Sequence, residues 1–289
     1  MNARLQIRIL ILVICVSGII LFAQPLFASH NFRIAFLDIG QGDAIFIESP
    51  TGRQMIIDGG PSGSFGPSLS APILGQLSDI MGPLDRTVDV VVSTHPDADH
   101  IGGLASVFSR YEVGTFIDPG ISSETVTYSN LMSAVADEHS EYLIARRGMK
   151  IDLGGGVTAE VLSPSGGKEK ELNDYSIVIK ISFGSQDILL TGDASIKIEK
   201  ELVLADKDIL QSEILKVGHH GSKTSSDPEF VKIVSPEYAI ISVGKNNRYG
   251  HPNETALASL RDASAVILRT DELGLIEFES DENSLIRKR

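Results

Sequence analysis

The stretch that decides the fold is STHPDADHIGG, residues Ser93 to Gly103. It places two histidines and two aspartates within six positions: His95, Asp97, Asp99 and His100. An apolar, β-branched run, VDVVV, precedes it and a pair of glycines follows, so a buried strand is expected to end in this loop. Imidazole nitrogens and carboxylate oxygens are ligands for divalent metals. A solvated loop would crowd like charges without gain, and the stretch therefore predicts a metal-binding loop.

Other donor residues follow other apolar strands. Five of the seven histidines lie in three motifs, THPDADHIGG, VGHHGSK and RYGHP, and the motif LTGD ends a strand on Asp193. Strand ends that converge on one sheet edge are where metals collect. A two-metal site needs about four ligands per ion, counting water. Asp193 is suited to bridge two ions, and His219 or His220, together with His251, is expected to complete the ligand shells.

Three donor residues are interpreted as structural. His30 lies beside the expected cleavage site of the N-terminal segment, and His139 lies in a helical region rich in acids. Asp43, in the motif GQGD, is the type of residue found in turns.

Hydrophobic periodicity predicts strands alternating with helices. A β-hairpin is expected over Phe32–Glu48, and Pro61–Pro72 is expected to be a mobile loop. No linker divides the chain into two cores, which predicts a single α/β sandwich of two sheets with helices outside. The other expected strands are Gln54–Gly60, Val88–His95, Val113–Ile117, Val157–Pro164, Ser176–Phe183, Asp187–Asp193, Ala265–Thr270 and Gly274–Ser280. Helices are expected over Gly103–Arg110, Glu124–Glu138 and Ser195–Leu204, and from about Asp227 and Asn253. In the third of these, Ser195 is the expected N-cap and Ile196 the first helical residue.

Residues 1–28 have the composition of a secretory signal peptide. Arg4 and Arg8 precede an apolar run from Ile9 to Ala23, and small residues follow at the expected cleavage site. An uncleaved membrane anchor is the alternative, although the run is shorter than the ~20 residues that span a bilayer. Either interpretation predicts a secreted or extracytoplasmic protein, whose only contact with a membrane is this segment if it is retained.

The charge of the remaining chain limits its partners. Without Arg4 and Arg8, the 25 basic residues fall to 23 against 38 acidic residues, a net charge of −15. Such a chain has no general attraction for nucleic acid or anionic membranes, so a polyanionic substrate must be held locally. The single cysteine, Cys15, lies in the N-terminal segment, so the rest of the chain has no thiolate ligand.

Together these motifs resemble the metallo-β-lactamase superfamily and, within it, the hydrolase domain of ComEC-type DNA-uptake proteins. The family motif His-x-His-x-Asp-His stands here as HPDADH, with Asp97 in place of the second histidine, a departure typical of that branch. The resemblance extends through FLDIGQGDAIFIES, MIIDGG, LTGD, LKVGHHGS and ISVGKNNRYGHP. It implies a four-layer αββα sandwich, a single hydrolase domain over residues 32–280 and two divalent metal ions.

The resemblance also implies roles for individual residues. Asp99 orients or activates the attacking water. Asp58 is a carboxylate that supports the metal ligands or the local structure without binding metal itself. Either His219 or His220 binds substrate or donates a proton to the leaving group, and their order stays open. The implied metal ligands are His95, Asp97, Asp99, His100, Asp193 and His251.

One histidine ligand of the superfamily pattern has no counterpart in this chain. The superfamily usually supplies a further histidine between the first motif and the bridging aspartate, where this chain has LNDYSIVIKI. Asn173 or Asp174 is the expected replacement. A donor set richer in oxygen shifts the preference from zinc towards manganese, with zinc kept as the alternative.

The expected reaction is hydrolysis by metal-activated water, which suits phosphodiesters, lactams, lactones and thioesters alike. Lys216, Lys223, Lys245 and Arg248 lie near the late motifs and are interpreted as phosphate-binding residues or as ordinary surface cations. With the branch resemblance, this predicts an exported phosphodiesterase or nuclease acting on a small phosphodiester or on single-stranded DNA. Another ester or amide, including an envelope component, is the alternative substrate, and a non-catalytic metal-binding module is the alternative class. No stable protein partner is expected.

Overall fold

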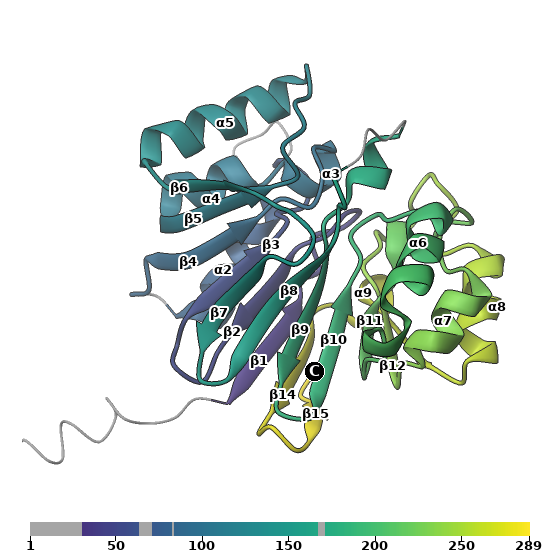
Figure 1. The fold of residues 1–289 in the computed structure, drawn as a ribbon. Helices are drawn as coiled ribbons and strands as arrows, with labels where there is room; N and C mark the ends of the chain where they lie inside the picture. The colour runs from purple at the N-terminus through teal and green to yellow at the C-terminus, as the bar shows by residue number, and fades with distance from the viewer. Residues whose placement is uncertain (1–30, 64–70, 83, 167–170) are drawn as a thin grey trace, which may run out of the picture. The chain divides into compact units, whose positions relative to one another are not determined.

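Two β-sheets packed face to face form the centre of the fold (Figure 1). The computed structural model describes residues 31–63, 71–82, 84–166 and 171–289. The expected N-terminal signal or anchor segment, His30 and most of the expected mobile loop lie outside the described residues. Among the described helices, none has the length and apolar character needed to cross a membrane.

The first sheet has eight strands. Its order is β15 (Leu285–Arg287), β14 (Ile276–Ser280), β1 (Phe32–Phe36), β2 (Ile45–Glu48), β3 (Gln54–Ile57), β4 (Thr87–Val92), β5 (Glu112–Asp118) and β6 (Glu141–Ile144). Strands β1 and β2 form the predicted hairpin, with Phe36 opposite Ile45. From β3 to β6 the strands are parallel, so their carboxyl ends share one edge of the sheet.

The second sheet has seven strands and the same division into antiparallel and parallel halves. Its order is β13 (Val266–Arg269), β12 (Tyr238–Ile241), β11 (Ile214–Lys216), β10 (Gln186–Leu190), β9 (Val178–Phe183), β8 (Val157–Ser163) and β7 (Lys150–Gly154). Strands β10 to β13 are parallel. Parallel neighbours need crossover connections, which are usually helices.

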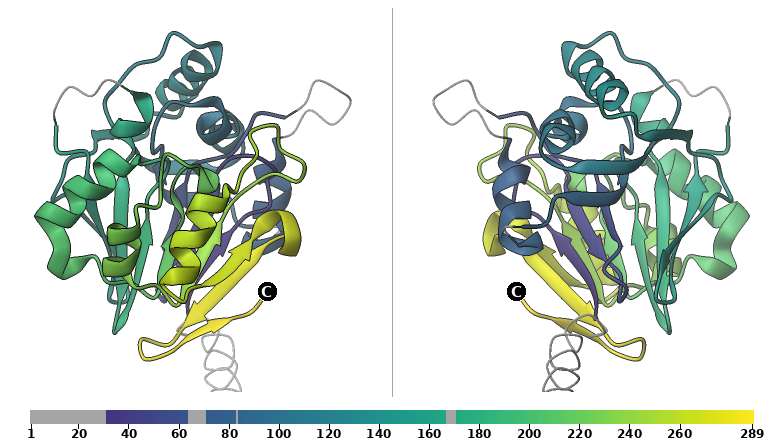
Figure 2. Two further views of the ribbon diagram at one scale, coloured as in Figure 1. Left: turned by 90° about the vertical axis from the view of Figure 1, so that its right-hand side faces the viewer. Right: turned by 90° about the vertical axis from the view of Figure 1, so that its left-hand side faces the viewer.

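Helices cover the outer faces of the two sheets (Figures 1 and 2). On the first sheet they are α2 (Pro72–Met81), α3 (Ala98–Ile101), α4 (Leu104–Arg110) and α5 (Val126–Glu138). On the second they are α6 (Ile196–Asp206), α7 (Pro228–Val234) and α8 (Glu254–Asp262), while the short α9 (Thr270–Leu273) joins β13 to β14. The arrangement is the expected four-layer αββα sandwich in one domain.

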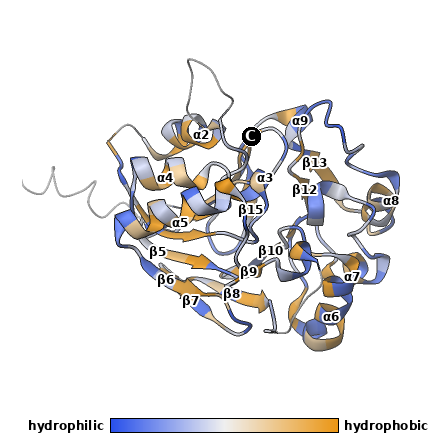
Figure 3. Ribbon diagram, turned by 90° about the horizontal axis from the view of Figure 1, so that it is seen from above, coloured by the Kyte–Doolittle hydropathy of each residue, from blue (hydrophilic) through white to orange (hydrophobic). Residues whose placement is uncertain are grey.

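Strand β4 shows why the sequence folds into layers. Side chains alternate along a strand, so Val90 and Val92 point into the core between the sheets while Val91 packs against the helices. A strand buried on both faces needs a continuous apolar run, which Val90, Val91 and Val92 supply. The view from above shows mostly hydrophobic central strands and outer helices of mixed character (Figure 3).

Helix starts agree with the sequence, with one difference. Asp227 and Asn253 cap α7 and α8 by accepting hydrogen bonds from Glu229 N and Thr255 N. Ser195 precedes α6 as predicted, but its hydroxyl donates to Asp174 and makes no capping bond. The expected cap position is therefore correct, while the expected capping interaction is replaced by a bond to the neighbouring loop.

Candidate metal centre

The predicted donors meet where the parallel strands of both sheets end. His95 follows β4, Asp193 follows β10, His219 and His220 follow β11, and His251 follows β12. Carboxyl ends of parallel strands form the ligand-binding edge of α/β sheets. The short α3 then turns back from Asp97, which places Asp99 and His100 beside the end of the same strand.

Asp193 lies between two sets of histidines. Its Oδ1 is 3.2 Å from His100 Nε2 and 3.7 Å from His220 Nε2. Its Oδ2 is 3.9 Å from His95 Nε2 and 3.6 Å from His219 Nε2. Each carboxylate oxygen therefore faces a different set, which is the geometry required of a bridging ligand.

The two aspartates of the first motif divide between these two sets of histidines. Asp97 Oδ2 is 3.6 Å from His95 Nε2, and Asp99 Oδ2 is 3.5 Å from His220 Nε2. We call His95, Asp97 and Asp193 Oδ2 the first donor group, with His219 at its edge. The second donor group consists of Asp99, His100, His220 and Asp193 Oδ1.

The buried atoms of the two donor groups fit a cation. His95 Nε2, His100 Nε2, His220 Nε2 and Asp193 Oδ1 are buried and have no hydrogen-bond partner. Buried polar atoms are nearly always paired. Lone pairs that converge without a donor between them are what a divalent ion requires, so the residues present fit the two ions that the motifs imply.

The other ring nitrogens show how the lone pairs are directed. His100 Nδ1 is 2.8 Å from Asp58 Oδ2, and His220 Nδ1 is 2.9 Å from the Ser242 carbonyl oxygen. Because both acceptors lack a proton, each Nδ1 must donate, which leaves each Nε2 free to accept a metal.

His95 is oriented by a chain of two hydrogen bonds. Thr94 Oγ1 donates to Asp58 Oδ2 at 2.6 Å, so its lone pair can accept from His95 Nδ1 at 3.0 Å. Asp58 thus supports one ring directly and another through Thr94, which is the supporting role that the resemblance implied.

Electrostatics at the centre favours added positive charge. Burial opposes protonation of His100, but the Asp193 and Asp58 carboxylates raise its pKa well above its usual value. Burial opposes protonation of His220 as well, yet Asp193 and Asp43 raise its pKa to about 9. The same carboxylate field that holds protons on these rings attracts metal cations.

Asp43 and Lys216 form a buried ion pair behind the second donor group. Lys216 is 0% exposed, and its Nζ lies 2.6 Å from Asp43 Oδ2. Burial raises the pKa of Asp43, but Lys216, His220 and His100 outweigh burial and hold that pKa below its usual value. The interpretation of Lys216 as a phosphate-binding or surface cation is therefore wrong. The interpretation of Asp43 as a turn residue missed its role: its Oδ1 is 3.4 Å from His220 Nδ1.

The loops of the centre are held in close contact. Asp43 N donates to Asp99 O at 3.3 Å, and Gly59 N donates to His100 O at 2.6 Å. Gly42 has φ +125°, and a Cβ there would lie 1.9 Å from Asp99 O. Only glycine permits this approach.

Three site residues also adopt left-handed backbone conformations: Asp58, His219 and His220, with φ of 60°, 48° and 54°. Strained non-glycine residues of this kind cluster at functional sites.

The remaining predicted residues occupy distinct places. His251 packs edge-on against His219 with ring centroids 5.6 Å apart, and its Nδ1 has no hydrogen-bond partner. Asn173 Nδ2 is 3.3 Å from His219 Nδ1, whereas Asp174 accepts from Ser195 Oγ and pairs with Lys197. Of the two proposed replacements, Asn173 therefore faces the centre.

His139 ends α5 on the surface with φ 60° and bonds to the Asp137 carbonyl oxygen through Nδ1. This is the structural role expected for it.

Two cavities open onto the centre. One of about 130 Å³ lies over the second donor group and is lined by Asp99, Asp193, His220 and His251, among others. One of about 560 Å³ is lined by Asn173, Ser195 and Thr224. Asp97 and His219 line both, so the two cavities meet at the donor groups.

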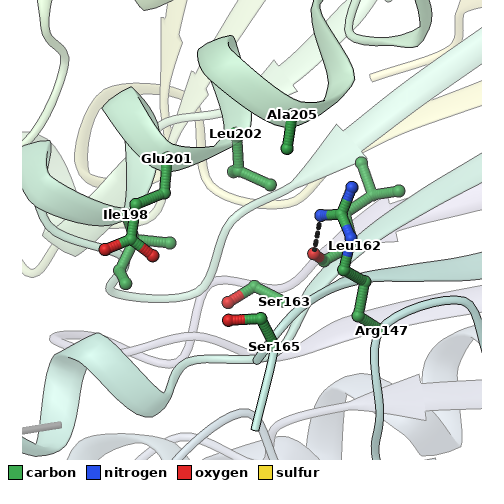
Figure 4. Close-up of a pocket in the computed structure, with 8 residues that line it drawn as sticks. All are labelled: Arg147, Leu162, Ser163, Ser165, Ile198, Glu201, Leu202 and Ala205. Carbon is green, nitrogen blue, oxygen red and sulfur yellow. Dashed lines mark hydrogen bonds between the residues drawn. The ribbon is translucent and has the colours of Figure 1, made fainter. Parts of the chain in front are cut away.

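A further cavity, of about 100 Å³, lies between α6 and the end of β8 (Figure 4). The guanidinium of Arg147 there donates to the Leu162 carbonyl oxygen and pairs with Asp206, so this cavity offers no free cation from Arg147.

Comparison with known proteins agrees with this geometry. The model of the family described as "Metallo-beta-lactamase superfamily" matches residues 37–245. The chain belongs to this superfamily. It is a metal-dependent hydrolase of that superfamily, and its fold implies divalent metal ions.

Similar curated proteins share the competence-related branch. The chain is 32% identical over 276 residues to "ComE operon protein 3" of Bacillus subtilis, covering 91% of this chain and 35% of that protein. It is 29% identical to "Competence protein ComA" of Neisseria gonorrhoeae, covering 92% of this chain and 35% of that protein. The chain thus spans about a third of the length of these relatives. The resemblance to ComEC-type proteins is confirmed.

Similar solved structures support the fold alone. YhfI of Bacillus subtilis, a metallo-beta-lactamase fold protein, superposes with a TM-score of 0.56 at 10% identity, covering 87% of this chain and 100% of that one. Zn(2+)-bound PqqB of Methylobacterium extorquens superposes with a TM-score of 0.54 at 11% identity, covering 82% and 97%.

Proposed function

We propose that the chain is a metal-dependent phosphodiesterase whose substrate is single-stranded DNA. The observation that carries the proposal is the pair of cavities that meet at the donor groups and share Asp97 and His219. A phosphodiester held at that point would have a cavity of about 130 Å³ and one of about 560 Å³ next to it for the groups on either side of the cleaved bond. The name of one relative, "Competence protein ComA", refers to competence, and that of another, "Recombination protein 2" of Haemophilus influenzae, refers to recombination; both names favour a nucleic-acid substrate.

The donor groups provide the metal ligands. His95, Asp97 and Asp193 would hold one ion, and Asp99, His100, His220 and Asp193 would hold the other. When bound, such ions would lower the pKa of the attacking water and neutralise charge on the phosphate oxygens.

This chain's own residues orient the reaction. Asp99 also orients the attacking water, because its side chain is 34% exposed and lines the smaller cavity. His219 contacts the substrate, since its side chain is 28% exposed and lines both cavities, whereas that of His220 is 2% exposed. This assigns the substrate-contacting role of the histidine pair to His219.

Exposed cations supplement the ions. Lys223 precedes Thr224, which lines the larger cavity, and Arg248 precedes Tyr249, which lines the smaller one; both cations are exposed, as is Lys245. Because the chain as a whole carries a net charge of −13, these residues and the ions must supply the attraction for phosphate locally.

A substrate panel tests the proposal. The purified chain, loaded separately with Mn²⁺ and Zn²⁺, is offered single-stranded DNA, bis-p-nitrophenyl phosphate and a chromogenic cephalosporin. We expect cleavage of both phosphodiesters and higher activity with Mn²⁺, because the donor groups are rich in carboxylates. Cleavage of the cephalosporin alone would refute a phosphodiesterase, and bound metal without any turnover would favour a binding module.

Matched aspartate variants separate turnover from contamination. Asp99→Ala should abolish cleavage. Asp137→Ala removes an exposed carboxylate of α5 and should leave the rate unchanged. Equal activity in the two variants would show that another protein in the preparation is responsible.

We also propose that the protein is exported, on the basis of the charge and apolar run of residues 1–28. Mass spectrometry of the protein isolated from cells should find the mature N-terminus near Ser29 in an extracytoplasmic fraction. Intact chains confined to the cytoplasm would refute export.

A further inference from the structure

An aromatic ring stands at the rim of the smaller cavity. Tyr249 is 53% exposed and lines that cavity together with Asp99, His220 and His251. Covering an exposed aromatic ring removes a large apolar area from water, which is favourable, and tyrosine is enriched at binding interfaces. The mechanism described above gives Tyr249 no role.

The loop that carries Tyr249 is held in place. Asn247 Nδ2 donates to the carbonyl oxygens of Gly244 and His251 at 3.1 and 2.6 Å. Its Oδ1 accepts from Tyr249 N and His251 N at 3.1 and 3.0 Å. Gln41 Oε1, from the loop between β1 and β2, accepts from Gly244 N at 3.1 Å. The ring therefore sits on a prearranged loop and not on a free hairpin.

Neighbouring groups orient the ring and charge its surroundings. The ring of Tyr249 stacks on that of His251 with centroids 5.7 Å apart and an interplanar angle of 26°. The Arg248 guanidinium carbon lies 5.2 Å from the Tyr249 centroid, and Arg248 Nη2 donates to the Tyr249 hydroxyl at 3.1 Å. An exposed ring with a cation over it, at the mouth of a phosphodiesterase site, has the features that bind single-stranded nucleic acid.

We infer that Tyr249 is a stacking platform for the base next to the cleaved phosphodiester, with Arg248 beside it to contact the adjacent phosphate. The inference rests on the proposed function and deepens it, because it makes a nucleobase part of the recognised substrate. Stacking on an aromatic side chain is tolerant of sequence, so the platform selects for a nucleotide without selecting which one. The larger cavity, on the other side of Asp97 and His219, receives the strand beyond the cleaved bond.

Kinetics of three variants test the platform. Tyr249→Ala, Tyr249→Leu and Tyr249→Phe are compared with the unmodified chain on a ten-residue oligothymidylate and on methyl p-nitrophenyl phosphate, which has no base. We expect Tyr249→Ala to reduce kcat/KM for the oligonucleotide roughly tenfold more than for the small diester, mainly through KM. Tyr249→Phe should stay within about twofold of the unmodified chain on both, and Tyr249→Leu should resemble Tyr249→Ala.

An abasic substrate gives a second readout. An oligothymidylate with one abasic site, moved along the strand, should bind the chain that keeps Tyr249 more weakly at one position. At that position the further loss caused by Tyr249→Ala should disappear, because the base and the ring form one contact. Dissociation constants come from fluorescence anisotropy in an Asp99→Asn background with Mn²⁺, which prevents turnover.

The outcomes separate the two proposals. If the unmodified chain cleaves neither diester, the proposed function fails, while the anisotropy measurement still tests the ring. If Tyr249→Ala binds the oligonucleotide like the unmodified chain, or loses equally on both substrates, the platform is refuted and the phosphodiesterase stands.

Discussion

The buried pair of Lys216 and Asp43 makes the most demanding prediction. The Lys216 side chain is 0% exposed, and its Nζ contacts Asp43 Oδ2 at 2.6 Å and the Val217 carbonyl oxygen at 2.9 Å. Lys216→Met keeps most of the side-chain volume and removes the charge. It leaves the Asp43 carboxylate buried without its cation, and breaking a buried pair in this way costs about 3–5 kcal/mol. This is a large part of the ~5–15 kcal/mol that stabilises a typical domain.

The pair can be isolated by a double-mutant cycle. Asp43→Asn alone leaves the Lys216 ammonium buried without its carboxylate and should reduce the free energy of unfolding by a similar amount. The double variant contains neither charge, and replacing both members of a buried pair is often close to neutral. We therefore expect the double variant to be more stable than the sum of the single losses predicts, by at least ~2 kcal/mol.

Urea unfolding followed by circular dichroism, with the chain free of metal in EDTA, gives these free energies. The slope of free energy against urea should stay constant, which shows that the variants unfold from similarly compact states. Lys232→Met, at an exposed position of α7, is the matched control and should change stability by less than about 0.5 kcal/mol. Additive losses in the cycle, or a loss below ~1 kcal/mol for Lys216→Met, would refute the reasoning.

Three further predictions follow from the structure. Burial raises the pKa of Glu199 to about 7 despite hydrogen bonds from the backbone. Because the carboxyl pKa is higher in the folded chain, the free energy of unfolding should fall as pH rises from about 4.5 to 7. Glu199→Gln should remove this pH dependence when unfolding is measured from pH 4 to 8. A Cβ at Gly42 would meet Asp99 O, whereas one at Gly40 would meet nothing within 4 Å, although both residues have positive φ. Gly42→Ala should therefore reduce kcat at least ~10-fold more than Gly40→Ala. Equal rates of the two variants would contradict the close approach of Gly42 to Asp99. Metal at 100 times its dissociation constant should stabilise the chain by about 2.7 kcal/mol, and Asp193→Ala should lose most of this gain together with bound metal measured by mass spectrometry; an unchanged metal content would show that Asp193 does not bridge.

Local features of the sequence were sufficient for the fold class and for the first motif. The spacing of His95, Asp97, Asp99 and His100 after an apolar strand involves only neighbours in the chain. Strand alternation and helix caps such as Asn253 are equally local. Such signals predicted the layers, because each depends on the period of a single element.

Elements without a local signal were not predicted. β6 is exposed along its whole length at the edge of the first sheet, so it has no alternation of apolar and polar residues. The helix α2 begins at Pro72 without a side-chain cap, directly after a stretch whose composition indicated only a loop.

The sequence by itself determined which residues can bind metal and that they follow strands that share an edge. The tertiary structure alone decided how they are paired: that Lys216 lies buried against Asp43, that His220 lies inside the centre while His219 faces the cavities, and that Asn173 rather than Asp174 contacts His219. The physical reason is that these contacts join residues far apart in the chain. Their distances depend on the order of strands in two sheets, and no local period or composition encodes that order.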